Sequence, residues 1–369
     1  MSRLGRTINK NRPTVLTGVL VATAIAFGGG PALALTEAEI VNLKGPERQK
    51  ILVAGARKEG TVVWYSAMII DQALRPVSNA FQKKYPFIKV TYWRGNSRKI
   101  LQKVLAEKRA NALVADIVEG SGLAKGMLKA NAVQPFSSPE LAAYPKEYIH
   151  PKRLWVTSRF RYLSVAYNTK LVSKSEAPKS YEDLLNPKWK GRMAWRTGAS
   201  SSGALLMITN WRTAWGDKKT EAFLKKLAKQ DVTPVQASNR TVVNRVIEGE
   251  YWIAIGASAH HPIISAKKGA PVYSQIMPPV PGLNGTIMVL NGIKHPYAAM
   301  LLVDFVLSEE GQNVLRQANY LPAHPKVAPR PEMKIIVPRL VGMEENFITP
   351  AILFENRKQT RAMFNKYFK

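Results

Sequence analysis

The sequence alternates short apolar runs with amphipathic segments, and this alternation limits the possible folds more than any other feature. Residues 61–66 are apolar almost throughout, as in a strand buried on both faces of a parallel sheet. Residues 71–85 follow with apolar side chains at helical spacing, and Pro86 ends that segment. Two further strands are expected at 88–93 and 115–119, with a helix between them. Repeated strand–helix units of this length predict an α/β fold with parallel strands.

A second group of elements follows a Pro- and Ser-rich stretch at 135–151. Apolar runs around 154–167 indicate strands that cross into a second lobe. Residues 251–255 predict another buried strand, reached through several helical segments. The runs between 274 and 290 predict the return crossing. The chain from residue 35 to residue 369 is long enough for two bodies, each with its own core.

The first 34 residues have the pattern of an export signal. An apolar run at 15–28 is too short to span a bilayer comfortably, and Ala32-Leu33-Ala34 matches a small-x-small cleavage site. The basic residues in front of the run are Arg3, Arg6, Lys10 and Arg12. We therefore expect 1–34 to be a cleaved signal peptide of the general secretory route, a mature chain that begins near Leu35, and a periplasmic location. The alternative is a signal anchor that stays uncut.

The amino-acid composition excludes several kinds of chemistry and favours anionic partners. The chain has no cysteine, which excludes disulfides, thiolate nucleophiles, lipoprotein anchoring and cysteine-based zinc sites. Its 54 Lys and Arg against 25 Asp and Glu give a net charge of +29, and four of these charges belong to the leader. The basic residues are scattered and form no dense run. We therefore expect an anionic solute and no nucleic acid, with binding to polyanions at a basic surface as an alternative.

A polar loop at 194–204 is the first candidate for a ligand site. It lies between an expected strand and an expected helix and contains Arg196, Thr197 and three serines, Ser200, Ser201 and Ser202. The first amide groups of a helix have no internal acceptor and carry partial positive charge, so they can bind an anion. Arg196 can add a planar pair of donors. The ordinary alternative is a serine N-cap followed by a loop without function.

Other candidate residues lie where the expected strands end. In open α/β sheets, ligands bind beyond the carboxyl ends of the strands. For any one of these loops an ordinary connection is the alternative, but several at the same edge favour a site. The additional ligand-binding candidates are Tyr65, Ser66, Arg94, Ser97, Glu119, Ser121, Asn239, Arg240 and Ser258.

Six stretches, in order along residues 60–325, together resemble one protein family. They are Val63–Ser66 (VWYS), Ala80–Pro86 (AFQKKYP), Ala166–Val172 (AYNTKLV), Asp183–Gly191 (DLLNPKWKG), Asp304–Gln312 (DFVLSEEGQ) and Asn319–Pro322 (NYLP). The chain resembles the periplasmic solute-binding proteins of ABC importers, in the branch that holds ferric-iron, thiamine, polyamine and sugar-phosphate binders.

The resemblance implies a type II periplasmic binding protein with two α/β lobes, each a mainly parallel sheet flanked by helices. Hinge strands join the lobes, which close on a ligand. It implies a first lobe of 35–157 and 283–369 and a second lobe of 158–282. It also implies an ABC permease and its ATPase as partners of a monomeric binding protein that uses no cofactor.

The same resemblance raises ferric iron or another metal as an alternative ligand. Iron-binding members place adjacent tyrosines in the loop that matches 256–262, where this chain has His260 and His261. Ferric iron prefers phenolate and carboxylate oxygens, whereas imidazole suits softer ions. Tyr65 and Glu119 could still supply oxygens, and an anion at 197–202 could complete the coordination.

A secreted hydrolase is a remote alternative, and we expect no enzyme activity. In the serine loop, 198–203 does not fit the G-x-S-x-G pattern, because the last glycine comes one residue late. The chain has no cysteine nucleophile and no H-E-x-x-H motif. Three histidines, His150, His295 and His324, stand beside prolines in expected loops, without an obvious serine partner.

We predict that Arg196→Ala combined with Ser201→Ala weakens binding of the solute at least tenfold. A charge-assisted contact contributes about 1.5–3 kcal/mol, so its loss should be visible in calorimetry. Unchanged affinity in the double variant would reject the loop as a binding site.

Overall fold

The computed structural model describes the secondary structure of residues 35–198 and 203–368. The expected signal peptide, 1–34, and the three loop serines at 200–202 lie outside the described residues. Contacts divide the chain into Met1–Leu35 and Thr36–Lys369, and the second unit is described below by itself. None of the described helices is long and apolar enough to cross a membrane.

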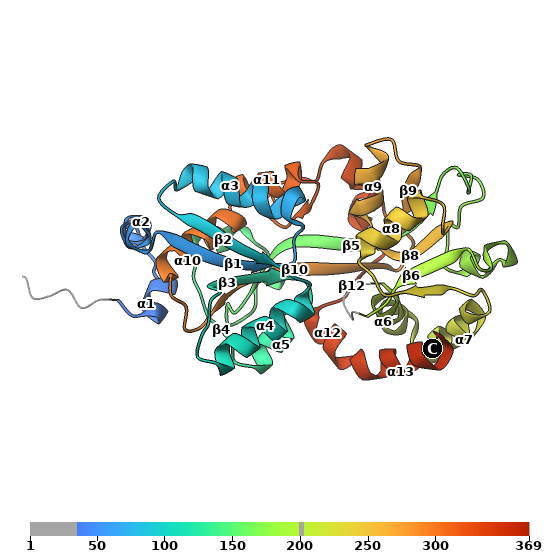
Figure 1. Ribbon diagram of the computed structural model, residues 1–369, viewed down its shortest axis with the longest axis horizontal. Coiled ribbons are helices and arrows are strands. Elements are labelled where there is room, and N and C mark those ends of the chain that lie inside the picture. Colours follow the sequence, from blue (N-terminus) through green and yellow to red (C-terminus); the bar gives the residue numbers. More distant parts are fainter. Residues whose placement is uncertain (1–34, 199–202, 369) are drawn as a thin grey trace, which may run out of the picture. The chain divides into compact units, whose positions relative to one another are not determined.

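The first half of the unit is built around three parallel strands. The central strand, β1 (Thr61–Ser66), pairs with β2 (Lys89–Arg94) on one side and with β3 (Ile117–Gly120) on the other. Helices lie along both faces of these strands (Figure 1). The helices of this half are α1 (Glu37–Val41), α2 (Arg48–Glu59), α3 (Arg75–Lys84), α4 (Ser97–Arg109), α5 (Ala124–Lys129), α10 (Pro296–Leu307) and α11 (Glu309–Gln317). We call this half the first lobe.

The second half repeats the arrangement with different strands. Its central strand, β6 (Met193–Arg196), is parallel to both β7 (Thr233–Val235) and β8 (Ile253–Ser258). The helices of this half are α6 (Ala204–Trp215), α7 (Asp217–Ala228), α8 (Asn239–Ile247) and α9 (His260–Ala266). We call this half the second lobe.

Two long antiparallel strands join the lobes. They are β5 (Val156–Asn168) and β10 (Val280–Leu290), which pair with each other. At one end β10 pairs with β3, and at the other β5 pairs with β8, so the sheet order is β2-β1-β3-β10-β5-β8-β6-β7. Short strands complete the edges: β4 (Val133–Gln134), β9 (Val272–Gln275), β11 (Leu321–Pro322) and β12 (Glu345–Phe347). The predicted α/β architecture, with parallel sheets and joining strands, is confirmed.

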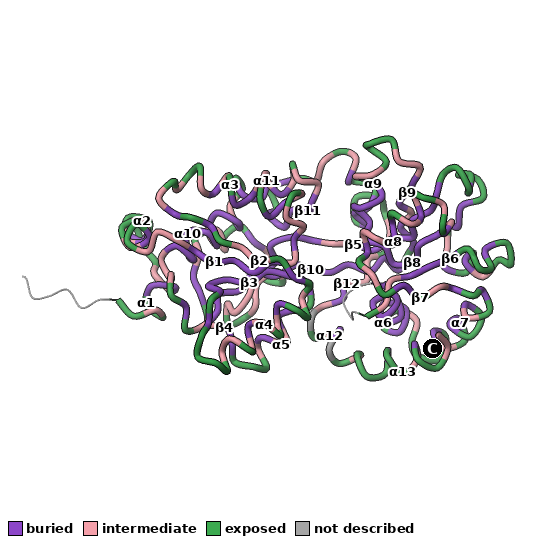
Figure 2. The backbone as a smooth tube through the Cα atoms, viewed as in Figure 1, coloured by how far each residue is buried: buried purple, intermediate pink, exposed green. Residues whose placement is uncertain are grey.

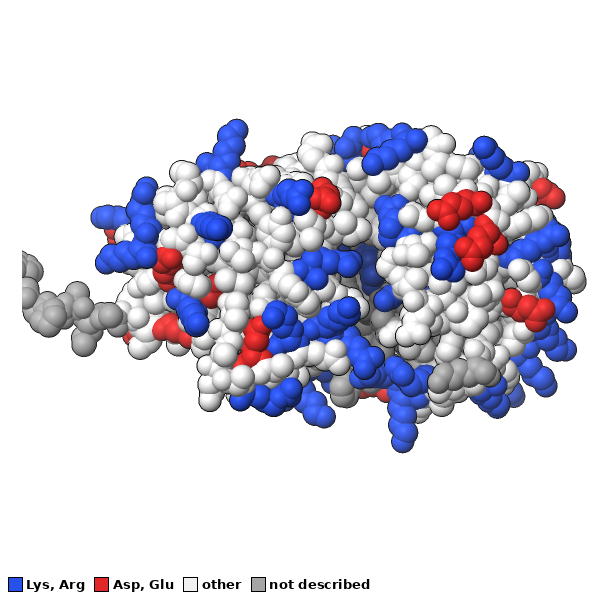
Figure 3. Space-filling view, viewed as in Figure 1, with Lys and Arg blue, Asp and Glu red and all other residues white. Residues whose placement is uncertain are grey.

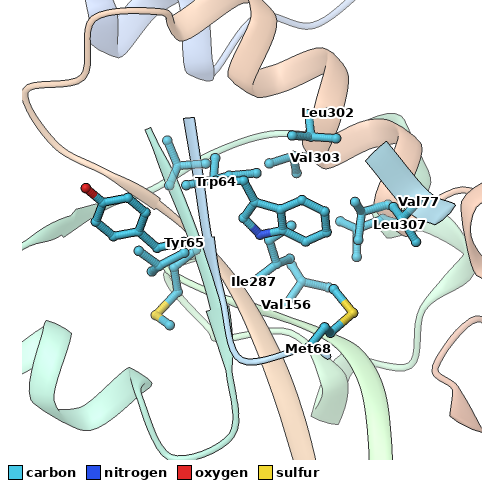
Figure 4. Packing of buried hydrophobic residues seen from close by; sticks show 14 of the residues in the cluster. Trp64, Tyr65, Met68, Val77, Val156, Ile287, Leu302, Val303 and Leu307 are labelled. Carbon is cyan, nitrogen blue, oxygen red and sulfur yellow. The ribbon is translucent and has the colours of Figure 1, made fainter. Parts of the chain in front are cut away.

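Apolar packing gives each lobe its own core. The strands are largely buried along their length (Figure 2). In the first lobe, fully buried Trp64 of β1 lies among Val156, Ile287 and Val303 (Figure 4). Tyr65 projects from the other side of the same strand, because side chains alternate along a strand. This alternation decides which residues of β1 face the α10 side of the sheet.

Short helical turns connect the main elements. They are a π-helical turn at Ile70–Leu74 and 3-10 turns at Pro139–Ala143, Lys146–Tyr148, Glu182–Leu185, Pro187–Trp189, Pro331–Ile336 and Pro338–Leu340. Asn96 caps α4, since the Asn96 side chain accepts a hydrogen bond from the Lys99 amide.

The C-terminal segment departs from the expected assignment of 283–369 to the first lobe. Two helices, α12 (Pro350–Glu355) and α13 (Arg357–Phe368), end the chain. The last of them packs on α6 and α7 of the second lobe, where Phe364 belongs to the apolar core. The apolar face of α13 is therefore buried against the second lobe. The lobe boundaries at 157 and 282 remain a prediction.

Buried Asp116, just before β3, connects the first-lobe sheet to the start of α10. Its carboxylate accepts hydrogen bonds from the Val63 amide at 2.7 Å and from the amides of Lys294 and His295 at 3.2 Å each. His295 Nδ1 lies 2.9 Å from the same carboxylate. The side chain is 1% exposed.

We predict that Asp116→Ala lowers the free energy of unfolding by about 3 kcal/mol or more, because three backbone donors lose their acceptor in a buried place. Urea denaturation measures the change. Glu47→Ala is the control, since this exposed carboxylate makes only a surface pair with Lys50, and the expected loss is under about 1 kcal/mol. Equal losses in the two variants would contradict the role given to Asp116.

Candidate functional site

A cavity of about 790 Å³ lies where the two lobes meet at the crossing strands. Residues of both lobes line it, and Figure 3 shows Lys and Arg side chains inside and around the hollow. No Asp or Glu is among its described lining residues. The basic lining residues are Arg94, Arg98, Lys99, Lys125, Arg159, Arg161, Arg196, Arg240, Arg357 and Arg361. A wall of one sign makes this cavity attractive to anions.

Two of these arginines come from the crossing strand β5. Arg159 and Arg161 are two residues apart, so they lie on the same face of the strand. Arg159 Nε donates to Glu119 Oε1 at 2.9 Å, and this ion pair is almost fully buried. Across the register Gly285 is opposite Arg159, and a Cβ there would come within 2.7 Å of Glu119 Oε1. The glycine thus leaves room for the pair that holds Arg159 at the cavity wall.

Arg196 reaches the cavity from the end of β6. Its Nε donates to the carbonyl of Ala237 at 2.7 Å. The start of α6 lies against the backbone of Arg196. A Cβ added to Gly203 would come within 2.1 Å of the Arg196 carbonyl oxygen. Gly203 also has a φ of +63°, which favours glycine, so this approach depends on that residue.

The arginines influence one another strongly. Burial, with the neighbouring Arg159 and Arg196 as smaller causes, lowers the pKa of Arg161 to about 9. Burial lowers the pKa of Arg196 too, with Arg94 as the second cause. Arg161 therefore stays protonated at neutral pH. A bound anion would offset the repulsion among these arginines, so the cluster is suited to binding an anion.

The starts of α4 and α8 lie at the cavity, one in each lobe. Asn96 and Ser97 at the start of α4 line it from the first lobe, and Ser238 and Asn239 at the start of α8 line it from the second. Cap side chains take one amide in each first turn. The preceding amides have no acceptor within their helix and can donate to a ligand.

The histidine pair lies in the second-lobe wall and is neutral. Burial lowers the pKa of His260 to about 3, with smaller contributions from Arg159, Arg161 and Arg240. The pKa of His261 lies well below its usual value, chiefly because of burial and next because of His260. His260 also stacks against Tyr320, with ring centroids 5.4 Å apart. The pair can hydrogen-bond to a ligand without adding charge.

Most of the candidate residues from the sequence line this one cavity. These are Arg94, Ser97, Ser121, Arg196, Thr197, Asn239, Arg240, Ser258, His260 and His261. Within the group, Asn239 Nδ2 donates to Ser258 Oγ at 3.1 Å, and Ser97 Oγ donates to the Ser121 carbonyl. The loop candidates Ser200, Ser201 and Ser202 lie outside the described residues.

Three candidates do not line the cavity. Tyr65 donates through its hydroxyl to Glu107 Oε1 at 2.7 Å and belongs to the first-lobe core. Ser66 donates to Glu119 Oε2 at 2.7 Å, so both side chains form a buried layer behind the wall. Trp195, next to the candidate Arg196, does not line the cavity either. It is fully buried against the last helix, and its ring centroid lies 4.6 Å from that of Phe368.

Several lining residues escaped the sequence analysis. Arg159 and Arg161 are separated by one residue, Phe160, and this alternation could have placed both on one face of a strand. Tyr320 lies within the stretch Asn319–Pro322, which served only for the resemblance. Arg357 and Arg361 gave little signal, because basic residues are scattered along the whole chain.

Among the described residues, no group of three or more His, Cys, Asp or Glu is arranged to hold a metal ion. The two oxygen donors expected for iron, Tyr65 and Glu119, are hydrogen-bonded outside the cavity. A metal cation would also meet the repulsion of the basic wall.

The sequence pattern of the family described as bacterial extracellular solute-binding protein matches residues 113–336. An uncharacterized protein of Haemophilus influenzae is 27% identical over 283 residues, which cover 72% of this chain and 79% of that protein. The Fe(3+)-binding periplasmic protein of Serratia marcescens is 26% identical over 241 residues, 63% of this chain and 70% of that protein.

Among solved structures, the periplasmic binding protein AfuA from Actinobacillus pleuropneumoniae, with fructose-6-phosphate bound, superposes with a TM-score of 0.71. It is 20% identical, and the match covers 84% of this chain and 98% of that one. The expected fold, that of a type II periplasmic binding protein, is thereby confirmed.

We predict that His260→Gln makes stability less dependent on pH between 6.5 and 5. The folded protein keeps His260 neutral down to a pKa of about 3, whereas the unfolded chain binds a proton near pH 6.5. Stability from this group is therefore complete above pH 6.5 and falls with pH, by about 1.4 kcal/mol per pH unit.

Urea denaturation of the wild type and of His260→Gln at pH 7 and pH 5 measures the effect. The wild type should lose about 2 kcal/mol more than the variant between the two values. Comparison within each protein removes any difference that the substitution makes at pH 7. Parallel losses would show that His260 is protonated in the folded state.

Proposed function

Because this chain belongs to the family of bacterial extracellular solute-binding proteins, we propose that its ligand is a small organic anion: an organic phosphate, a phosphonate or a carboxylate. The single observation that carries the proposal is the cavity wall, with eight arginines, two lysines and no acidic side chain among its described residues. Such a wall disfavours cations and favours anions.

The size and chemistry of the cavity support a small ligand. Its volume of about 790 Å³ is in the range of pockets that enclose small molecules, roughly 300–1,000 Å³. The guanidinium groups of Arg161 and Arg196 offer planar pairs of donors that match phosphate and carboxylate oxygens. Thr197 and Ser258 add hydroxyl groups, and the starts of α4 and α8 add backbone amides.

We further propose that lobe closure captures the ligand in the periplasm and that an ABC permease with its ATPase receives it. The antiparallel pair β5 and β10, the long connection between the lobes, is the expected hinge. The leader pattern at 1–34 and the periplasmic relatives support this location. We propose binding and release without catalysis, as expected for the family.

Ferric iron is the second candidate, because the relative from Serratia marcescens is named as an Fe(3+)-binding protein. Tyr65 and Glu119 would have to leave their present hydrogen bonds to coordinate it. An iron–anion complex would satisfy the basic wall better than the bare ion. The test below therefore includes ferric citrate.

The proposal is tested with purified mature protein in a thermal-shift series of organic phosphates, phosphonates, carboxylates and ferric citrate. A tight ligand raises the melting temperature by mass action, and calorimetry then gives the affinity. We predict that Arg161→Gln weakens binding of the best anion at least tenfold, because a charge-assisted contact contributes about 1.5–3 kcal/mol.

Lys190→Gln is the matched control. This lysine is exposed on the second lobe outside the cavity and makes a surface pair with Asp231 at 3.6 Å. Its affinity should stay within about twofold of the wild type, as expected for loss of a surface charge. The iron alternative would replace the proposal if only ferric citrate raised the melting temperature and produced a visible absorption band, while iron-free anions had no effect.

A further inference from the structure

We propose that the ligand carries two separate anionic groups and that Arg357 and Arg361 of the C-terminal helix α13 bind the second one. The inference rests on the proposed function and narrows the ligand class to anions with two charged groups. The C-terminal segment thus completes the binding site. The two arginines line the cavity, although they come nearly two hundred residues after β5.

The helix α13 is held firmly to the second lobe. Arg212 of α6 donates to Thr360 Oγ1 at 3.0 Å and to Gln359 Oε1 at 2.8 Å, and Asp217 orients the same guanidinium. Phe364 is buried one turn after Thr360. A residue one turn after another lies on the same face of a helix, so Arg357 and Arg361 share a face as well. They are therefore positioned by packing rather than by an ion pair.

The connection to α13 also borders the first lobe. Helix α12 lies against α5, and Glu355 at its end pairs with Lys125 of α5 at 3.4 Å. Leu353 and Lys125 line the cavity next to these elements. The C-terminal segment thus forms a rim that reaches from one lobe to the other. We call Arg357 and Arg361 the rim arginines.

The rim arginines form a second basic group, apart from the one at the crossing strands. The inner cluster, Arg94, Arg159, Arg161 and Arg196, lines the same cavity, and Arg159 is paired with buried Glu119. The rim arginines are exposed, and within the described residues neither forms an ion pair with an acid. Nearby Glu355 is occupied by Lys125.

One small anion needs only one of the two groups. A phosphate or carboxylate group is satisfied by two or three arginine forks and a helix start, which the inner cluster already supplies. The charges of the two further arginines on the wall of the same cavity then stay without a counter-charge from the ligand. A ligand with a phosphate at one end and a second phosphate or a carboxylate at the other would neutralise both groups.

The rim arginines could alternatively only attract anions on their way to the inner cluster. Steering of this kind raises the association rate of every anion, and most that of the more highly charged one. Its effect fades as salt screens the charges, whereas a direct contact keeps its preference at physiological ionic strength. The two roles therefore differ in a measurable way.

The experiment compares pairs of probes that differ by one anionic group. The pairs are glycerol 3-phosphate with 3-phosphoglycerate, and fructose 6-phosphate with fructose 1,6-bisphosphate. Calorimetry at physiological ionic strength gives affinities for the wild-type mature protein and for Arg357→Gln/Arg361→Gln. In at least one pair, the wild type should bind the doubly charged probe at least tenfold more tightly. The double variant should lose this preference while its affinity for the singly charged probe changes less than threefold.

Lys358→Gln/Lys225→Gln is the control, because it removes two exposed charges from α13 and α7 outside the cavity lining. It should keep the preference of the wild type. Two results would overturn the inference and leave the proposed function standing. One is equal affinity of the wild type for the singly and the doubly charged probe of each pair. The other is a loss of affinity in the double variant that is the same for both probes. Failure of all four probes, together with no response in the thermal-shift series, would overturn both.

Discussion

Like charges repel, and the central constraint on this molecule is that a group of arginines faces one another across a single cavity. Burial and mutual repulsion lower the pKa of Arg161 and Arg196. The fold tolerates this because several of these arginines are held by hydrogen bonds to other groups. Arg159 has Glu119, Arg196 has the Ala237 carbonyl, and Arg240 donates to Ser265. The cavity is thus arranged for a negative guest before one arrives, which reduces the cost of ordering side chains on binding.

The secondary structure serves this arrangement. Two parallel sheets present the carboxyl ends of their strands and the starts of α4 and α8 to the same space. The antiparallel strands β5 and β10 join the sheets, so their residues lie at the back of the cavity. Arg159 and Arg161 therefore sit where a hinge would bend, and a ligand held by them would touch both lobes. Under the proposed function, binding and closure would be coupled, because the ligand would gain its second set of contacts only when the lobes approach.

The candidate site shows why strand-end reasoning succeeds in part. The rule for open α/β sheets led to Arg94, Ser97, Ser121 and Ser258, which all line the cavity. The rule failed for Tyr65, Ser66 and Glu119, which stand at the same strand ends but turn into a buried layer. Side chains alternate along a strand, and sequence position alone does not decide which of two neighbours faces the ligand. The hydrogen bonds of Glu119 to Ser66 and Arg159 made that choice, and they join residues far apart in the chain.

The amino-acid sequence by itself determined the α/β class, the parallel strands and the crossing between two lobes, and its net charge led to the proposal of an anionic ligand. These follow from local apolar periodicity and from net charge, which need no knowledge of distant contacts. Only the tertiary structure decided that Arg159, Arg161 and Arg196 share one wall with Arg357 and Arg361, and that α13 packs on the second lobe. Those facts depend on which surfaces meet when the chain closes on itself. They result from long-range packing of apolar faces, such as that of Phe364 in the second-lobe core.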